Sequence, residues 1–213
     1  MQEDFATKLR NAFADHSPNR PVVEDARPAA VLIPFYADPE PTVIFTVRTD
    51  TLSSHKGQIS FPGGSIDPDD SDPIHAALRE TQEEIGLDPD LVTVVGELDT
   101  TPTYVSGYLV TPVVGLLDSK PTLTPNPAEV AEVLEIPLND LTDEIRREPG
   151  FTHGGMTYPT EAWVWRDYVI WGVTARLLRL LLERLGQAGL IDLPGETDSW
   201  TGPPPPRMPD GAT

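Results

Sequence analysis

The chain has 213 residues and carries 34 acidic against 15 basic side chains, which gives a formal net charge of −19 at pH 7. We expect no nucleic-acid partner, because neutralising phosphates requires clustered Lys and Arg. The chain has no cysteine, which excludes disulfides, thiolate metal sites and cysteine nucleophiles.

No apolar run approaches the length of a membrane span, and the first residues lack the apolar run of a signal peptide. We therefore expect a cytoplasmic protein without a membrane partner. Within residues 1–26, Phe5, Leu9 and Phe13 recur at four-residue spacing, which predicts a short helix that packs on the core. Residues 27–192 are expected to form the main domain. Residues 193–213, rich in Pro, Gly and Asp, are expected to form a flexible tail.

The main domain begins with strand patterns. The continuous apolar run at 29–36 predicts a strand buried on both faces. After a turn at 38–41, the β-branched run at 42–48 predicts its partner strand. Residues 58–61 alternate between polar and apolar side chains and lead into a pair of glycines at 63 and 64.

A helix with clear ends follows these glycines. Ser71 and Asp72 can each cap its start, and Pro73 suits the first helical position. Gly86 can adopt the left-handed conformation that closes a helix. The face expected to be buried consists of residues in one i, i+3, i+4 stripe: Ile74, Ala77, Leu78, Thr81 and Ile85.

A second stripe of this helix is acidic and consists of Glu80, Glu83 and Glu84. Three close carboxylates repel one another, and a divalent cation that prefers oxygen ligands would offset that repulsion. Arg79 lies four residues before Glu83 and can hold its carboxylate from the side. The stripe therefore indicates a metal site rather than a solvated acidic face.

Small residues around the acidic stripe support this interpretation. Ala76 and Ala77 lie one turn before the glutamates, and we expect them to leave room for a ligand. Gly63 and Gly64 have no side chains, so their backbone can approach a ligand closely.

Further elements follow the helix. Strands are predicted at 92–98, 108–117 and 128–136, a short helix at 138–147, a hairpin from 151–158 and 161–165, and a leucine-rich helix at 169–186. Strands mixed with two substantial helices predict an α/β sandwich with a mixed sheet between helices.

Residues 79–87, RETQEEIGL, resemble the second half of the Nudix hydrolase signature, Arg-Glu-(apolar)-x-Glu-Glu-x-Gly-(apolar), with Thr81 at an apolar position. The first half departs from the signature, which has Gly, five residues, Glu and seven residues. Here the five residues after Gly64 are followed by Asp70 instead of Glu, and eight residues then precede Arg79. This departure leaves the first acidic position without an assigned role. Turn and cap roles are the favoured interpretation of the loop carboxylates, although one of them could add a metal ligand: Asp67, Asp69, Asp70 and Asp72.

Residues 48–64, RTDTLSSHKGQISFPGG, resemble the segment that marks coenzyme A pyrophosphatases within the Nudix group, R-x-x-x-L-x-x-H-x-G-Q-x-x-F-P-G-G. The resemblance implies an α/β/α sandwich and hydrolysis of the pyrophosphate bond of coenzyme A or a derivative. The products would be 3′,5′-ADP and 4′-phosphopantetheine or its acylated form. It also implies Mg²⁺ as the cofactor, with Mn²⁺ as a substitute.

The resemblance also implies site residues. Metal ligation falls on Glu80, Glu83 and Glu84. Glu83 and Glu84 are also expected to be catalytic, together with Arg79, which either contacts a substrate phosphate or orients Glu83. Nudix enzymes often take a general base from a glutamate beyond the signature, for which Glu129 is the first candidate and Glu132 the second. Substrate contacts are expected from the subfamily segment: Arg48, His55, Lys56, Gly57, Gln58, Gly63 and Gly64.

Two other functions stay open. The first is hydrolysis of ADP-ribose or another nucleoside diphosphate derivative, although the general Nudix pattern lacks the segment at 48–64. The second is a nucleotide sensor without turnover, which we would expect to lose metal carboxylates that this chain retains. The partner expected in each case is a small nucleotide, and a homodimer is compatible with these features.

Overall fold

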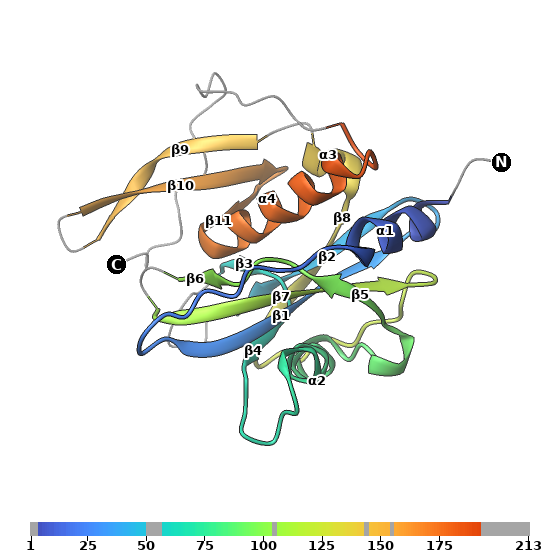
Figure 1. The fold of residues 1–213 in the computed structure, drawn as a ribbon, viewed down its shortest axis with the longest axis horizontal. Helices are drawn as coiled ribbons and strands as arrows, with labels where there is room; N and C mark the ends of the chain where they lie inside the picture. The colour runs from blue at the N-terminus through green and yellow to red at the C-terminus, as the bar shows by residue number, and fades with distance from the viewer. Residues whose placement is uncertain (1–3, 50–56, 104–105, 143–144, 154–155, 193–213) are drawn as a thin grey trace.

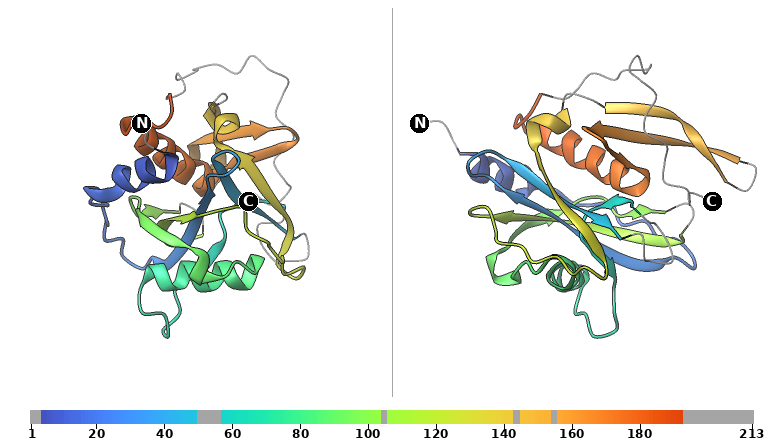
Figure 2. Two further views of the ribbon diagram at one scale, coloured as in Figure 1. Left: turned by 90° about the vertical axis from the view of Figure 1, so that its right-hand side faces the viewer. Right: turned by 180° about the vertical axis from the view of Figure 1, so that it is seen from behind.

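The computed structural model describes residues 4–49, 57–103, 106–142, 145–153 and 156–192. A large twisted sheet forms the middle layer (Figure 1). Helix α2 (Pro73–Ile85) covers one face of this sheet. Helices α1 (Phe5–Ala14) and α4 (Gly172–Gln187) cover the other face, as the turned views also show (Figure 2). The predicted α/β sandwich is therefore confirmed.

The sheet has eight strands in the described residues and mixes parallel with antiparallel pairs. The central strand β1 (Arg27–Tyr36) runs parallel to β7 (Tyr108–Leu117) over its whole length. The remaining strands are β2 (Thr42–Arg48), β3 (Ile59–Ser60), β4 (Gly63–Ser65), β5 (Thr93–Glu97), β6 (Thr101–Pro102) and β8 (Val130–Pro137). A 3₁₀ turn, η1 (Pro89–Leu91), links α2 to β5.

Strand β2 diverges from β1 soon after it begins. Their pairing covers only the start of β2, where Thr42 and Val43 face Tyr36 and Phe35. On its other edge β2 pairs with β8 along its whole length from Thr42, and beyond Val43 it pairs with β3 while β4 takes the place beside β1. The prediction that 42–48 partners the first strand thus holds for its first residues only. The divergence places the glycine pair of β4 inside the fold, next to α2.

The two faces of β1 belong to two separate apolar clusters. Ile33 and Phe35 pack toward α1 and α4, whereas Ala30 and Leu32 pack toward α2, and all four are fully buried. This confirms the prediction of a strand buried on both faces, since side chains alternate along a strand. The N-terminal helix joins the first cluster through Leu9 and Phe13, as predicted.

Ala76 and Ala77 are fully buried in the cluster between the sheet and α2. The expectation that they leave room for a ligand is therefore wrong. Their small side chains instead let the helix approach β1 closely, which brings the next turn of α2 against β4.

The C-terminal part differs from the prediction at three boundaries. Helix α3 (Leu138–Thr142) ends early, because residues from 145 onward pair across a second sheet. The predicted hairpin is present with longer strands, β9 (Ile145–His153) and β10 (Met156–Trp165). Residues 168–171 form β11 (Tyr168–Trp171) rather than the start of the last helix. The helix begins at Gly172, whose φ of +66° ends the extended strand.

Helix α4 has 16 residues, and no helix in the described part of the chain is both long and apolar enough to cross a membrane.

Candidate active site

Three chain segments meet beside the last two turns of α2. Strand β4 approaches with its glycine pair, β2 contributes its last residue, and the turn at 126–129 leads into β8. These segments lie far apart in the sequence, and the divergence of β2 from β1 brings them together. Every glutamate of the predicted acidic stripe belongs to this part of α2.

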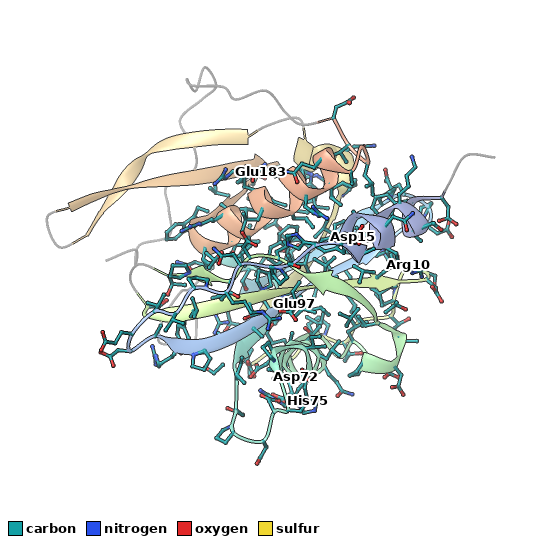
Figure 3. The ribbon with its side chains drawn as sticks, in the orientation of Figure 1. Arg10, Asp15, Asp72, His75, Glu97 and Glu183 are labelled. Atoms are coloured by element: carbon teal, nitrogen blue, oxygen red, sulfur yellow. The ribbon has the colours of Figure 1, made fainter. Side chains whose placement is uncertain are left out.

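The ends of α2 follow the predicted capping with one exception. The Asp72 carboxylate accepts a hydrogen bond from the backbone N–H of His75 at 2.8 Å, in the first turn of the helix (Figure 3). Ser71 does not cap the helix, because its hydroxyl donates to Asp72 instead. Gly86 closes the helix in the left-handed conformation, with φ of +67°.

Glu84 is the most enclosed carboxylate of the stripe and is only 3% exposed. Its Oε2 accepts the backbone N–H of Gly63 at 3.2 Å, and Arg48 Nη1 lies 3.7 Å from its Oε1. Burial raises the pKa of Glu84 to about 7, and the carboxylates of Glu129 and Glu80 act in the same direction against Gly63 and Arg48. The negative charges at this point are therefore incompletely balanced by the protein.

Glu80 lies against the backbone of Gly64. A Cβ atom at position 64 would lie 2.7 Å from the carboxyl carbon of Glu80, so any larger residue there would displace this carboxylate. Burial raises the pKa of Glu80, and the charges of Glu83 and Glu129 add to this while Arg79 opposes it. Glu83 differs from the other two, since its side chain is 57% exposed.

Arg79 connects the glutamates to the loop before the helix. Its Nη1 donates to Glu80 at 2.9 Å and to Glu83 at 3.4 Å. On its other side, Nε and Nη2 donate to the two carboxylate oxygens of Asp70 at 3.0 and 2.9 Å. Of the two predicted roles for Arg79, this geometry matches the orienting one, with Glu80 rather than Glu83 as the closer carboxylate.

Asp70 anchors Arg79, a role that the sequence analysis did not predict for it. Its side chain is 1% exposed and accepts hydrogen bonds from Arg79, from the backbone N–H of Asp67 at 2.8 Å and from His75 Nδ1 at 2.9 Å. The Arg79 hydrogen bonds hold the pKa of Asp70 well below its usual range. The first acidic position of the signature, here Asp70, therefore contacts the helix that carries the glutamates. Neither its side chain, which is shorter than that of Glu, nor the extra residue before Arg79 prevents its contact with Arg79. The sequence feature that could have identified Asp70 is its spacing, since five residues separate it from Gly64, as in the signature.

Glu129 lies immediately before β8, and its charge acts on both Glu80 and Glu84. Its Oε1 accepts a hydrogen bond from Asn126 Nδ2 at 3.1 Å. The second candidate base, Glu132, instead accepts the hydroxyl of Tyr168 at 2.6 Å. The structure thus brings Glu129, rather than Glu132, to the glutamates of α2.

The subfamily segment is described in part. Arg48 reaches the site through Glu84, as noted above. Gly57, with φ of +63°, and Gln58 bond to the backbone of Arg48: the Gly57 N–H donates to its carbonyl, and the Gln58 carbonyl accepts its N–H. His55 and Lys56 lie outside the described residues, so their predicted substrate contacts stay predictions.

The carboxylates fit a hard divalent cation by their chemistry, although they do not form a finished coordination sphere. Among the described residues, no three His, Asp or Glu side chains are already arranged to hold one ion. Arg79 draws Glu80 and Glu83 toward itself, and Glu84 turns to Gly63. All the donors are nevertheless carboxylate oxygens, and an enclosed Glu84 beside two further carboxylates is a favourable place for Mg²⁺ or Mn²⁺.

Comparisons of sequence and of structure with known proteins both find Nudix proteins. The model of the NUDIX domain matches residues 26–153. An uncharacterized Nudix hydrolase NudL of Photorhabdus laumondii is 39% identical over 169 residues, which cover 79% of this chain and 90% of that protein. A NudL of Yersinia pestis is 40% identical over 160 residues, or 75% and 80% of the two chains. The crystal structure of a MutT/nudix family protein from Enterococcus faecalis superposes on this chain with a TM-score of 0.50 and covers 88% of this chain and 76% of that protein. The sequence identity is 14%, so this likeness shows the fold alone.

The glycine pair allows a test that separates the site from the fold. In Gly64→Ala, the added Cβ would displace the Glu80 carboxylate, so we expect weaker Mn²⁺ binding by calorimetry and an almost unchanged thermal midpoint. In Gly63→Ala, the Cβ would lie 2.4 Å from the Ala30 carbonyl oxygen at a φ of +148°, so we expect a loss of about 1–3 kcal/mol in unfolding free energy. Wild-type Mn²⁺ affinity in a folded Gly64→Ala protein would contradict this assignment.

Asp70 predicts a specific pH dependence of stability. Its pKa is lower in the folded than in the unfolded protein, so its stabilisation is complete above a pH of about 4 and is lost as the pH falls further. We expect Asp70→Asn to be less stable than wild type in urea at pH 7, and the difference to shrink below a pH of about 4. Asp69→Asn, which changes an exposed carboxylate of the same loop, is the control. Equal stability curves for the two variants would show that Asp70 does not anchor Arg79.

Proposed function

Because this chain belongs to the Nudix hydrolase family, whose enzymes cleave phosphoric anhydrides, we propose that its substrate is coenzyme A or an acylated or oxidised derivative. Hydrolysis of the pyrophosphate bond would release 3′,5′-ADP and 4′-phosphopantetheine or its acylated form. Nudix hydrolases generally require a divalent cation, typically Mg²⁺. The coenzyme A assignment goes beyond the family and depends on the segment at 48–64.

The observation that supports this assignment is the contact of that segment with the glutamates at both of its ends. At the start of the segment, Arg48 lies 3.7 Å from Glu84. At its end, Gly63 donates to the same carboxylate and Gly64 lies against Glu80. The proposal therefore rests on the two described ends of the segment, which both lie at the glutamates of α2. This proximity of the two ends to glutamates of the family's signature is what supports a substrate role for the segment.

The proposed reaction is attack by water on one phosphorus of the pyrophosphate, in line with the oxygen that leaves. Glu80, Glu83 and Glu84 would hold the cation, which supplies neutralisation of the phosphate oxygens and a more acidic water. Glu129 would accept the proton of the attacking water at its carboxylate. One P–O bond forms and one breaks, so each product carries one of the two phosphates.

The neighbouring cations have supporting roles in this scheme. Arg79 holds Glu80 while Asp70 holds Arg79, so the first of the glutamates is fixed before substrate arrives. Arg48 partly neutralises Glu84 and is close enough to the centre to meet a substrate phosphate. The strongly acidic chain can accept an anionic substrate here, because a bound cation reverses the sign of the local field.

We predict that coenzyme A, incubated with the protein and Mg²⁺, yields 3′,5′-ADP in chromatographic product analysis, while ADP-ribose and NADH in separate tubes yield far less product. Glu84→Gln removes a buried ligand, so turnover should fall by at least about 100-fold at saturating Mg²⁺. Circular dichroism would check that this variant is folded.

The other outcomes separate the open alternatives. Preferred turnover of ADP-ribose would retain the reaction and reject the coenzyme A assignment. Metal binding without turnover of any of the three compounds would match the sensor. Undiminished turnover by Glu84→Gln would reject the assignment of the metal ligands.

A further inference from the structure

The turn at 126–129 is closed by the oxygen atoms of one residue, Asn126. Its carbonyl oxygen accepts the backbone N–H groups of Glu129 at 3.0 Å and Val130 at 2.8 Å. Its side-chain Oδ1 accepts the N–H of Ala128 at 3.1 Å. Asn commonly forms such turns, because its short side chain can replace a backbone acceptor.

The backbone of this turn is also tied to the helix that carries the glutamates. The N–H of Asn126 donates to the carbonyl of Glu84, and that of Thr124 donates to the carbonyl of Ile85, both at 2.8 Å. These carbonyls belong to the last turn of α2, where a helix leaves its own acceptors unpaired. From the other side, the N–H of Thr49 donates to the carbonyl of Glu129 at 3.0 Å. The backbone position of Glu129 is therefore set by α2 and by the end of β2.

The orientation of the Asn126 amide follows from these contacts. Only Oδ1 can accept the N–H of Ala128, so the amide nitrogen must face the opposite way. It lies 3.1 Å from Oε1 of Glu129 and donates to it. The carboxylate of Glu129 thus has a directed donor on the side of the turn, in a site where its other close charged neighbours include the carboxylates of Glu80 and Glu84.

We propose that Asn126 is a positioning residue for the reaction, which holds the carboxylate of Glu129 in place against repulsion from the glutamates of α2. This inference rests on the proposed role of Glu129 as the general base. Loss of the amide donor lets the Glu129 carboxylate move away from the attacking water. The effect is expected on kcat rather than on KM, because Asn126 acts through Glu129 and not on the substrate.

Asn126→Asp tests the donor with little change in the turn. Aspartate has the same shape and retains the acceptor for Ala128, but it places an oxygen where the amide nitrogen faces Glu129. We expect kcat to fall by about 10- to 100-fold with less than about a twofold change in KM, as for other groups that orient a reacting side chain. An unchanged kcat would overturn the proposal.

A double-mutant cycle with Glu129→Gln distinguishes positioning from a structural role. In the Glu129→Gln background the base is already lost. The glutamine amide can also donate to the carboxylate that Asn126→Asp introduces. Adding Asn126→Asp to Glu129→Gln should therefore change kcat by less than about twofold. In the background of the matched control Glu132→Gln, it should cost the same factor as in wild type. An equal loss in the Glu129→Gln background would overturn the positioning proposal alone. A wild-type rate for Glu129→Gln itself would overturn the base assignment and the positioning proposal together.

The cycle is run on whichever of the three diphosphate substrates the product analysis identifies, so failure of the coenzyme A assignment does not affect it. A second measurement needs no turnover. The side-chain amide resonances of Asn126, assigned by their loss in Asn126→Asp, should shift in the NMR spectrum of Glu129→Gln and stay unchanged in Glu132→Gln. Equal spectra for wild type and Glu129→Gln in this region would overturn the contact itself.

Discussion

The enclosed carboxylate of Glu84 is the constraint on which the rest of the site depends. A buried charge is costly unless nearby groups compensate it, and here the compensation comes from the backbone of Gly63 and the guanidinium of Arg48. Both contacts require that β2 diverge from β1 and that β4 take its place. The same divergence leaves room at Gly64 for Glu80. The divergence of β2 from β1 therefore determines which groups surround the carboxylates of α2.

Arg48 and Arg79 offset part of the negative charge in this region, and Arg79 contacts several carboxylates. Arg79 bonds to Asp70 on one side and to Glu80 and Glu83 on the other. It thereby fixes Glu80 while leaving Glu84 and Glu129 with excess negative charge between them. A divalent cation would bind where this excess remains, and we propose that the hydrogen bond from Asn126 would keep the Glu129 carboxylate beside it. In the proposed scheme, two contacts, one from Arg79 and one from Asn126, position the carboxylates for an ion.

Features set by local sequence were predictable, and features set by long-range pairing were not. The capping of α2 by Asp72 and Gly86 and the double burial of β1 follow from short patterns. The start of α4 was misplaced because residues 168–171 have a helical continuation in sequence but pair with β10 in space. For Asp70 a turn or cap role was favoured over a metal ligand, and its contact with Arg79 was not predicted, because it depends on how the loop folds back onto the helix. Asn126 belongs to no motif, and the role that we propose for it depends on contacts among α2, β2 and the turn before β8, which are distant in sequence.

The most direct test of this account is the anomalous diffraction of crystals grown with Mn²⁺. The account predicts a peak within about 2.0–2.4 Å of carboxylate oxygens from both Glu80 and Glu84, with Asp70 still bonded to Arg79 and Glu129 facing the ion. Manganese bound only in the acidic loop before α2, or no peak beside Glu84, would contradict the assignment of the metal site and with it the mechanism built on it.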